Sequence, residues 1–182
     1  MLERTLHPNS QTLLTAWQRM NVAAIDSPTG PTTREHPDLI ARLFVIQEET
    51  DNEWVFRTAG DQIQECLGRQ LADYDFLTFW SGFDRQMLEP LLKTISQEGM
   101  PGVVRARGEA LTGERVDVEL ILAPLAQTPH LKGGPRILGL YQTLGGESFL
   151  RGRPIWRHRL TAVFPPDVRT SEPRLKLVAS ND

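Results

Sequence analysis

Histidine and cysteine are the side chains best suited to metal binding or nucleophilic catalysis, and this chain has few of either. Its single cysteine is Cys66, and its four histidines are His7, His36, His130 and His158. A zinc site needs three or four clustered ligands, and the sequence brings no such cluster together. No histidine spacing supplies a base for Cys66 or for a serine nucleophile. We therefore predict no metal site and no catalytic site.

Carboxylates offer two other routes to chemistry. Asp117 and Glu119 share one face of a strand pattern, where paired acids are usually solvated surface. Asp61 or Glu65 would instead serve as a general base if it lay inside a small α+β pocket, and this enzymatic alternative stays open. Such a base would need a pKa that apolar surroundings have shifted.

Two arginines, Arg57 and Arg85, lie beside a dense aromatic run. A guanidinium binds a carboxylate or phosphate through two parallel hydrogen bonds, so each arginine is a candidate for holding an anionic ligand. The alternative is an ion pair with a nearby acid at the surface or at an interface. The aromatic residues Phe56, Phe79 and Trp80 line either a small-molecule pocket or a filled core.

These side chains belong to one stretch, from Glu53 to Trp80. Its first residues alternate in the manner of a strand, which stops at Ala59-Gly60. Helical spacing follows from Ile63 to Cys66 and Leu67, and Gly68 ends that turn. The stretch predicts one wall of a pocket, or of a core of similar size.

The elements before this stretch form a helix and a strand. Asn9-Ser10 is a candidate N-cap for an amphipathic helix whose apolar side carries Leu13, Leu14, Trp17 and Met20. Residues 26–33 contain prolines and glycine and indicate a linker. The strand at 43–46 pairs with the next strand as a hairpin. Both of its faces are apolar, so we expect the N-terminal helix to cover one of them.

Beyond the aromatic run the pattern predicts a helix and three strands. The helix begins at a capping box, Ser81 to Asp84, and should kink or divide at Pro90. Residues 103–110 and the alternating residues 115–122 form a hairpin, and the last strand covers 137–143. The element order is therefore helix, two strands, helices, three strands.

Composition limits the remaining possibilities. The 182 residues are 40% apolar and 24% charged, which suits one ordinary domain with extensions. A net charge of −3 argues against nucleic acid as the main partner. We see no signal peptide and no apolar run long enough to span a membrane, and we expect a cytoplasmic protein.

The two ends of the chain differ from its middle. We assign residues 1–33 to the N-terminal helix and linker, 34–144 to the main domain and 145–182 to a basic extension containing several prolines. Within that extension, 160–164 and 175–178 have the pattern of short strands. A protein partner could bind through the N-terminal helix or through this extension.

The order of elements, together with several short motifs, resembles a PAS domain. The closest likeness is to stand-alone bacterial PAS-like proteins with an N-terminal helix and no fused output domain. In this family the residue after the strand-to-helix corner is often Thr, whereas this chain has Asp61. The motifs are Trp17, Arg34 with His36-Pro37, Phe56-Arg57-Thr58-Ala59-Gly60, Gly68-Arg69-Gln70-Leu71, Glu119 to Leu125 and Ile137-Leu138-Gly139.

This resemblance implies an α+β fold, with a five-stranded antiparallel sheet in the order 2-1-5-4-3, helices over one face and an N-terminal helix. It also implies a non-catalytic sensor or regulatory domain that binds a small ligand and forms a homodimer. A purely structural dimerisation module is the third reading. The expected dimer interface comprises Leu13, Leu14, Trp17 and Met20. The expected pocket is lined by Phe56, Arg57, Ile63, Cys66, Phe76, Phe79, Trp80, Arg85 and Met87.

The same resemblance argues against two common cofactors. Haem-binding members carry a histidine on the pocket helices, and the four histidines here lie outside those helices. Flavin-binding light sensors use the motif Asn-Cys-Arg-Phe-Leu-Gln, whereas Cys66 lies in Gln-Glu-Cys-Leu-Gly. We predict no haem and no flavin, and an unidentified small molecule is the remaining ligand. A lone cysteine on an apolar face is usually inert packing.

Overall fold

One antiparallel sheet organises the computed structural model, which describes residues 6–22, 36–127 and 133–166. Within these ranges the strands lie in the order β2-β1-β5-β4-β3-β6. This confirms the predicted order 2-1-5-4-3 of the first five strands. The strands are β1 (Leu43–Thr50), β2 (Glu53–Ala59), β3 (Gly102–Ala110), β4 (Arg115–Leu125), β5 (Arg136–Thr143) and β6 (Ile155–Phe164).

The strand β6 extends the sheet past the boundary that we expected at residue 144. It pairs with β3 over its whole length, from Ile155 opposite Ala110 to Phe164 opposite Val103. The sequence pattern indicated only 160–164 as a strand. The first half was missed because its two buried residues, Ile155 and His158, lie three positions apart across a register shift and so break the strand alternation.

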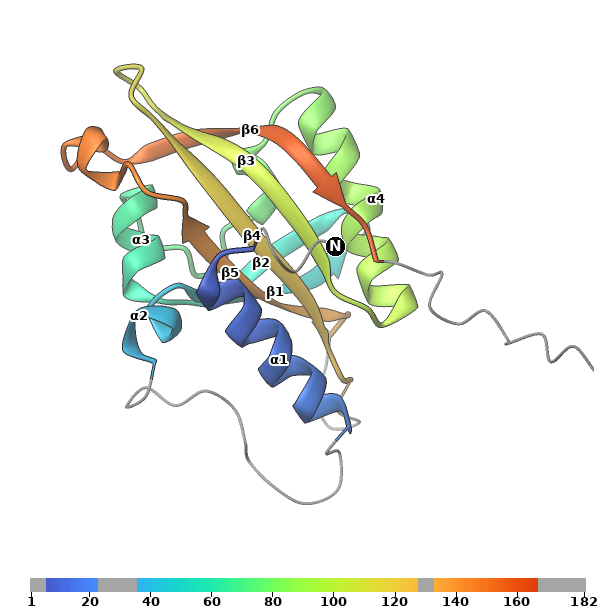
Figure 1. Cartoon of the computed structure of the whole chain (residues 1–182). Coiled ribbons are helices and arrows are strands. Elements are labelled where there is room, and N and C mark those ends of the chain that lie inside the picture. The colour runs from blue at the N-terminus through green and yellow to red at the C-terminus, as the bar shows by residue number, and fades with distance from the viewer. Residues whose placement is uncertain (1–5, 23–35, 128–132, 167–182) are drawn as a thin grey trace, which may run out of the picture.

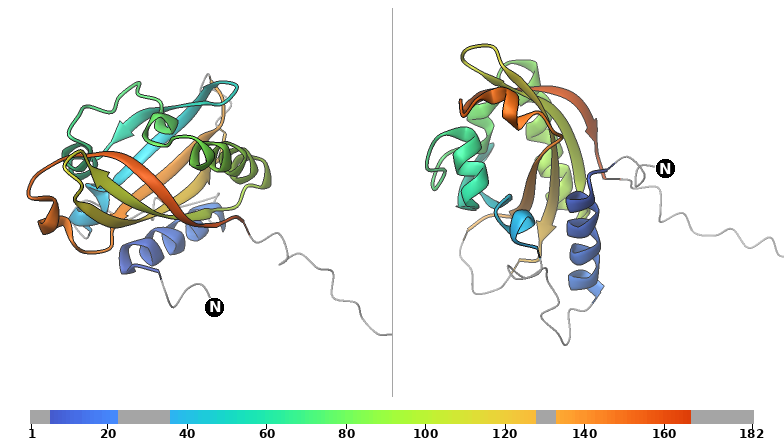
Figure 2. Two further views of the ribbon diagram at one scale, coloured as in Figure 1. Left: turned by 90° about the horizontal axis from the view of Figure 1, so that it is seen from above. Right: turned by 60° about the vertical axis from the view of Figure 1, so that its left-hand side comes forward.

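Helices cover both faces of the sheet (Figures 1 and 2). On one face lie α3 (Asp61–Leu67), the 3-10 turn η2 (Phe76–Phe79) and α4 (Phe83–Glu98). On the other lies α1 (Pro8–Val22), which contacts β4 and β5. The N-terminal helix therefore covers one sheet face, but over β4 and β5 and not over the strand at 43–46 where we expected it. Two short elements complete the described fold, α2 (Pro37–Ile40) and η3 (Glu147–Leu150).

The core has two parts, one on each side of the sheet. The larger part contains the aromatic side chains of β1, β2 and η2, packed against α3, α4 and the inward residues of the other strands. The smaller part lies under α1 and α2, where Leu13 and Leu39 pack with Ile121 and Leu140. An apolar layer on each face explains why the early strand is apolar on both sides.

Three local expectations were wrong. The helix α1 begins at Pro8, so neither Asn9 nor Ser10 is its N-cap. The helix α4 runs as one element through Pro90, so it is not divided there, whereas the kink stays a prediction; its N-cap is Gly82 without a side-chain hydrogen bond. The Asp84 carboxylate, which we expected in a capping box, instead accepts a hydrogen bond from the Leu160 backbone N–H at 3.2 Å.

Some expectations fall outside the described residues. These are the linker at 26–33, Arg34, His130, the short strand at 175–178 and parts of the two terminal extensions. Across the ranges that are described, every helix is too short or too polar to cross a membrane.

Candidate functional site

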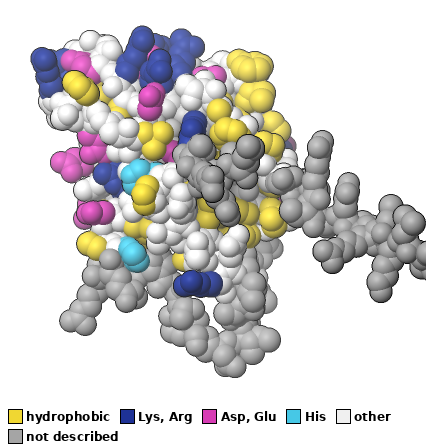
Figure 3. All heavy atoms as spheres, in the orientation of Figure 1, with side chains coloured by type: hydrophobic (Ala, Val, Ile, Leu, Met, Phe, Trp, Pro, Cys, Tyr) yellow, Lys and Arg dark blue, Asp and Glu magenta, His cyan; other side chains and the backbone are white. Residues whose placement is uncertain are grey.

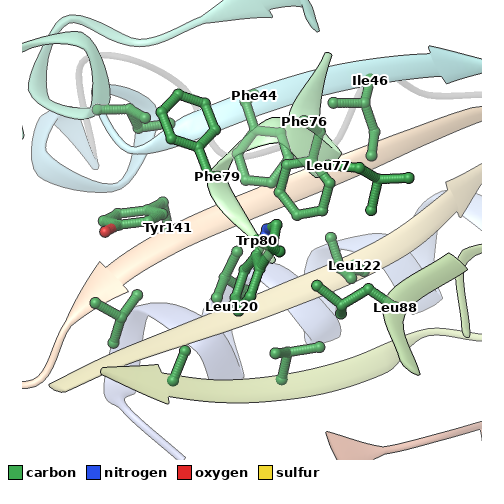
Figure 4. Close-up of a cluster of buried hydrophobic side chains, with 14 of the residues drawn as sticks. Phe44, Ile46, Phe76, Leu77, Phe79, Trp80, Leu88, Leu120, Leu122 and Tyr141 are labelled. Carbon is green, nitrogen blue, oxygen red and sulfur yellow. The ribbon is translucent and has the colours of Figure 1, made fainter. Parts of the chain in front are cut away.

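Aromatic rings from three elements meet on the face of the sheet that α3, η2 and α4 cover (Figure 4). Phe44 of β1 lies 5.5 Å from Phe56 of β2 and 5.9 Å from Phe76 of η2, measured between ring centroids. Phe79 and Trp80 continue the cluster, at 6.4 Å from Phe56 and 6.1 Å from Phe76 respectively. All five side chains are buried.

The aromatic run reaches this position because the segment before it is attached to the edge of β2. The Phe56 backbone N–H donates to the Tyr74 carbonyl, and the Asp73 N–H donates to the Phe56 carbonyl, both at 2.9 Å. The Asp75 carboxylate then accepts the Leu77 N–H at 3.0 Å and caps the 3-10 turn. These bonds fold η2 back over the sheet.

A polar pair lies among these rings. The Tyr141 hydroxyl of β5 and Nε2 of His158 on β6 are 2.7 Å apart, and both residues are buried. The His158 ring stacks on Trp80 with centroids 4.9 Å apart. Burial lowers the pKa of His158 to about 4, and a weaker interaction with the Phe79 backbone, of hydrogen-bond type, raises it. The ring is therefore neutral at pH 7. Burial also raises the pKa of Tyr141 well above its usual value.

Two ring nitrogens at this place lack partners among the described residues. They are Nδ1 of His158 and Nε1 of Trp80, both buried, and the contact of the His158 ring with the Phe79 backbone falls outside normal hydrogen-bond geometry. Buried polar atoms are hydrogen-bonded in nearly all folded proteins, so each exception needs a physical explanation. Here both belong to residues that line the same cavity.

The cavity itself is small. The volume open to the centre of a water-sized sphere is about 10 Å³, and one water needs roughly 10–15 Å³ by this measure. Its lining contains no charged residue and comprises Phe44, Phe56, Ile63, Leu67, Phe76, Phe79, Trp80, Leu120, Tyr141 and His158. The cavity is therefore at the lower limit for one water, and any larger molecule would need side chains to move.

The structure brings five of the expected pocket residues to this cavity and places the other four elsewhere. Those at the cavity are Phe56, Ile63, Phe76, Phe79 and Trp80. Cys66 is half-buried at the rim of a separate surface groove, with Glu147 among the other lining residues. Burial, followed by the Glu147 charge, raises the pKa of the Cys66 thiol, which disfavours the reactive thiolate.

The remaining three expected pocket residues lie away from the cavity. Arg57 forms ion pairs with Glu49 and Asp73. Arg85 pairs with Glu89 on the next helical turn. These pairs are the alternative that we kept open for both arginines. The side chain of Met87 is 40% exposed on α4.

Sequence reasoning missed Tyr141 and His158. Tyr141 was inside a correctly predicted strand, but its partner was in a segment that we assigned to an extension. The alternation Arg157, His158, Arg159 was the available signal, because it directs the histidine to the face opposite the two arginines. The acids of the enzymatic alternative, Asp61 and Glu65, are exposed on α3 and outside the cavity lining.

The helix α1 is attached to the sheet by polar contacts as well as by its apolar side. Glu119, which we expected at the solvated surface, is fully buried and accepts the His7 backbone N–H at 3.0 Å. Arg105 donates to the same carboxylate at 2.9 Å. At the other end, the Trp17 indole N–H donates to the Pro124 carbonyl at 2.8 Å.

These contacts affect the expected dimer interface. Leu13 and Trp17 are buried against the sheet of their own chain. Leu14 is half-buried, whereas Met20 is 37% exposed. Only the last two therefore offer apolar surface to another molecule in this arrangement.

No group of three or more metal-ligating side chains occurs in the part of the chain that the structure describes. Comparison with known proteins gives a family and several structural likenesses. A family model described as "PAS domain" matches residues 6–142. A search of the curated proteins returned no match.

Two of the similar solved structures are LOV proteins. The chain is similar to the Rhodobacter sphaeroides LOV protein, with 16% identity, a TM-score of 0.45, and 59% of this chain and 61% of that chain covered. It is also similar to a variant of RsLOV, with 19% identity, a TM-score of 0.44, and 58% and 61% covered. The match spans about three fifths of both solved chains.

Proposed function

The chain belongs to the PAS domain family, whose members are generally sensor or regulatory modules, and we propose that it is a non-catalytic sensor. In this proposal a small molecule occupies the aromatic cavity, and its occupancy changes contacts with another protein. The observation that carries the proposal is the buried pair of nitrogens without a normal hydrogen bond on His158 and Trp80, two residues that line one cavity among otherwise apolar rings.

The lining defines the class of ligand. No charged residue lines the cavity, and His158 is neutral at pH 7, so an ionic ligand would lose its hydration without compensation. The Trp80 indole can only donate a hydrogen bond. When the Tyr141 hydroxyl donates to Nε2, the proton of His158 is on Nδ1, which then donates as well. The ligand is therefore uncharged, compact and able to accept hydrogen bonds.

Binding of anything larger than water requires the cavity to open. The movable wall is η2, because few hydrogen bonds hold this single turn in place. In contrast, β1, β4 and β5 each have a hydrogen-bonded strand on both sides. Tyr141 and Leu120 belong to the cavity lining and to β5 and β4, the strands that α1 contacts. A shift of these strands would alter the docking of α1. A ligand can shift this equilibrium only by its difference in affinity for the two states.

Thermal shift measurements test the ligand site. Purified wild-type protein would be screened against uncharged hydrogen-bond acceptors, alongside His158→Phe and Ile63→Val. His158→Phe removes the polar atoms and fills the space, whereas Ile63→Val removes one methyl group from the same lining and costs about 1 kcal/mol. The proposal predicts stabilisation of wild type and Ile63→Val, and none of His158→Phe. No stabilisation of wild type, or equal stabilisation of His158→Phe, would overturn the ligand site.

The protein contact is proposed to be a homodimer formed beside α1. The exposed side of Met20 and the half-buried Leu14 provide its apolar surface. If the ligand site fails this test while the dimer is found, the structural dimerisation module becomes the better account. The enzymatic alternative has no supporting geometry, because Asp61 and Glu65 are outside the cavity lining.

A further inference from the structure

A set of arginines lies on the sheet face that bears α1, outside the site described above. We call it the arginine strip, and it comprises Arg105, Arg107, Arg115, Arg157 and Arg159 of β3, β4 and β6. Arg107 is directly opposite Arg159, and Glu109 is opposite both Arg115 and Arg157. Directly opposite residues share a face of an antiparallel sheet. The strip is therefore continuous across three strands.

The strip is accessible because α1 covers a different part of this face. The helix contacts β4 and β5, and the upper ends of β3, β4 and β6 extend beyond it (Figure 1). Dark-blue spheres gather near the top of the same view, over these strands (Figure 3). Arg107, Arg115 and Arg159 are exposed, and Arg105 and Arg157 are half-buried.

Acidic side chains neutralise the strip only in part. Glu109 pairs with Arg157 at 2.7 Å and with Arg115 at 3.1 Å. Arg107 pairs with Asp117 at 3.2 Å, and Arg105 with Glu119 at 2.9 Å. Three carboxylates thus serve four arginines. Arg159 forms no salt bridge to any described residue and lies directly opposite the like charge of Arg107, an arrangement that costs stability on its own.

An aromatic residue adjoins the strip at Arg157. The Trp156 side chain is 40% exposed, and the Arg157 guanidinium lies 4.9 Å from its ring centroid. Arginine and tryptophan are the residue types most enriched at the energetic centres of protein interfaces. Guanidinium groups pair with carboxylates in a two-pronged geometry.

We propose that the arginine strip is a docking site for an acidic segment of a different protein, whose Asp or Glu carboxylates pair with Arg159 and Arg107. The alternating acids favour a protein over nucleic acid, because Glu109 and Asp117 would repel a continuous phosphate backbone. The net charge of −3 for the whole chain has the same effect.

A second copy of this chain is a poorer occupant of the strip. A two-fold dimer through this surface would place arginines against arginines. The acidic region between Glu48 and Asp75 of another copy would complement the strip, but such a head-to-tail contact builds rings or open chains and not the two-fold homodimer proposed above. The partner is therefore a separate protein.

Fluorescence anisotropy tests the proposal with defined probes. The probes are a labelled twelve-residue peptide of alternating Glu and Ser, the same peptide with Gln replacing Glu, and a single-stranded oligonucleotide. The proposal predicts that the protein binds the Glu peptide at low salt and does not bind the Gln peptide. Its affinity for the Glu peptide should fall as salt screens the charges. Absence of binding to the Glu peptide would overturn it.

Charge-reversal variants locate the binding site. Arg159→Glu, with or without Arg107→Glu, should weaken Glu-peptide binding by about tenfold or more. Arg159→Gln serves as a milder variant if either reversal fails to fold. Arg19→Glu makes the same charge change at an exposed position of α1 and should leave binding within about twofold. Equal losses in Arg19→Glu and Arg159→Glu would show general charge attraction and overturn the proposal.

Two further readouts distinguish the occupants. Tighter binding of the oligonucleotide than of the Glu peptide would replace the protein partner by nucleic acid. A concentration-dependent mass increase that Arg159→Glu abolishes would assign the strip to a second copy. Either result contradicts the proposal, whereas a constant mass across variants together with selective Glu-peptide binding supports it.

Discussion

At the scale of single residues, His158 connects the filled core with the proposed sensing role. A neutral imidazole in an apolar core resists protonation, because burial disfavours its charged form. The Tyr141 hydroxyl satisfies one ring nitrogen, and the other has no hydrogen bond of normal geometry among the described residues. The site thus combines a stable neutral state with one unmet hydrogen bond, which an uncharged ligand or water can supply.

His158 should make folding stability depend on pH. Its pKa is about 4 in the folded protein and about 6.5 when unfolded, so its full contribution is present above pH 6.5 and is lost as the pH falls towards 4. The loss is about 3 kcal/mol. Urea unfolding of wild type and His158→Phe at several pH values measures it. The unfolding free energy of wild type, relative to that of His158→Phe, should rise as the pH rises from 4 to 6.5. A constant difference would contradict the assignment.

Gly139 is required by the aromatic cluster. It lies opposite Phe44 in the sheet, and a Cβ atom added there would meet ring atoms of Phe44 at 2.0 to 2.4 Å. We expect Gly139→Ala to cost about 1–3 kcal/mol in unfolding free energy, since the ring must move within a packed core. Denaturant titration measures this.

Gly108→Ala is the matched control for Gly139→Ala. A Cβ atom at Gly108 would meet the Ile155 side chain, with its terminal Cδ1 nearest at 2.8 Å. That terminal methyl can move at lower cost, so a loss of stability as large as that of Gly139→Ala would argue against a specific role for the Phe44 ring.

At the scale of elements, the sequence predicted regular segments well and their polar contacts poorly. The strands β1 to β5 and the helices α1, α3 and α4 follow from periodicity and from glycine or proline signals. The strand β6 was only half recognised, since its inward residues Ile155 and His158 are three positions apart and do not follow strand alternation. Glu119 was assigned to the surface because strand alternation cannot reveal that a distant helix covers the same face.

The attachment of α1 should depend on Glu119. Glu119→Gln keeps the size of the side chain but removes the charge that Arg105 and the His7 N–H contact, at a cost of about 1–2 kcal/mol. Native-state hydrogen exchange should then show faster exchange throughout α1, with smaller changes in α4.

Asp117→Asn is the control, because Asp117 lies on the same strand and its pair with Arg107 is exposed. This variant should change stability by less than about 0.5 kcal/mol. If Asp117→Asn loosens α1 as much as Glu119→Gln does, the buried carboxylate is not what holds the helix.

At the scale of the whole molecule, two faces of one sheet separate two tasks in this account. The face covered by α3, η2 and α4 encloses the cavity, and the opposite face carries α1 and the arginine strip. The aromatic wall could be predicted from sequence because its residues are close together in the chain. The polar pair of Tyr141 and His158 could not, since it depends on where two distant strands enter the sheet.

The proposed homodimer predicts a selective effect at Met20. A charge at this exposed apolar position should disrupt packing between copies, so Met20→Glu is expected to halve the mass measured by light scattering. Gln18→Glu adds the same charge at another exposed position of α1 and should keep the dimer. A monomeric wild type at concentrations near 0.1 mM would refute the homodimer.

Native mass spectrometry of the freshly purified full chain tests the sensing account most directly, because it reports retained ligand and subunit number together. The account predicts a dimer with a small adduct that disappears on denaturation and is absent from His158→Phe. A wild-type spectrum containing only the bare chain mass, in protein that no uncharged compound stabilises, would contradict it.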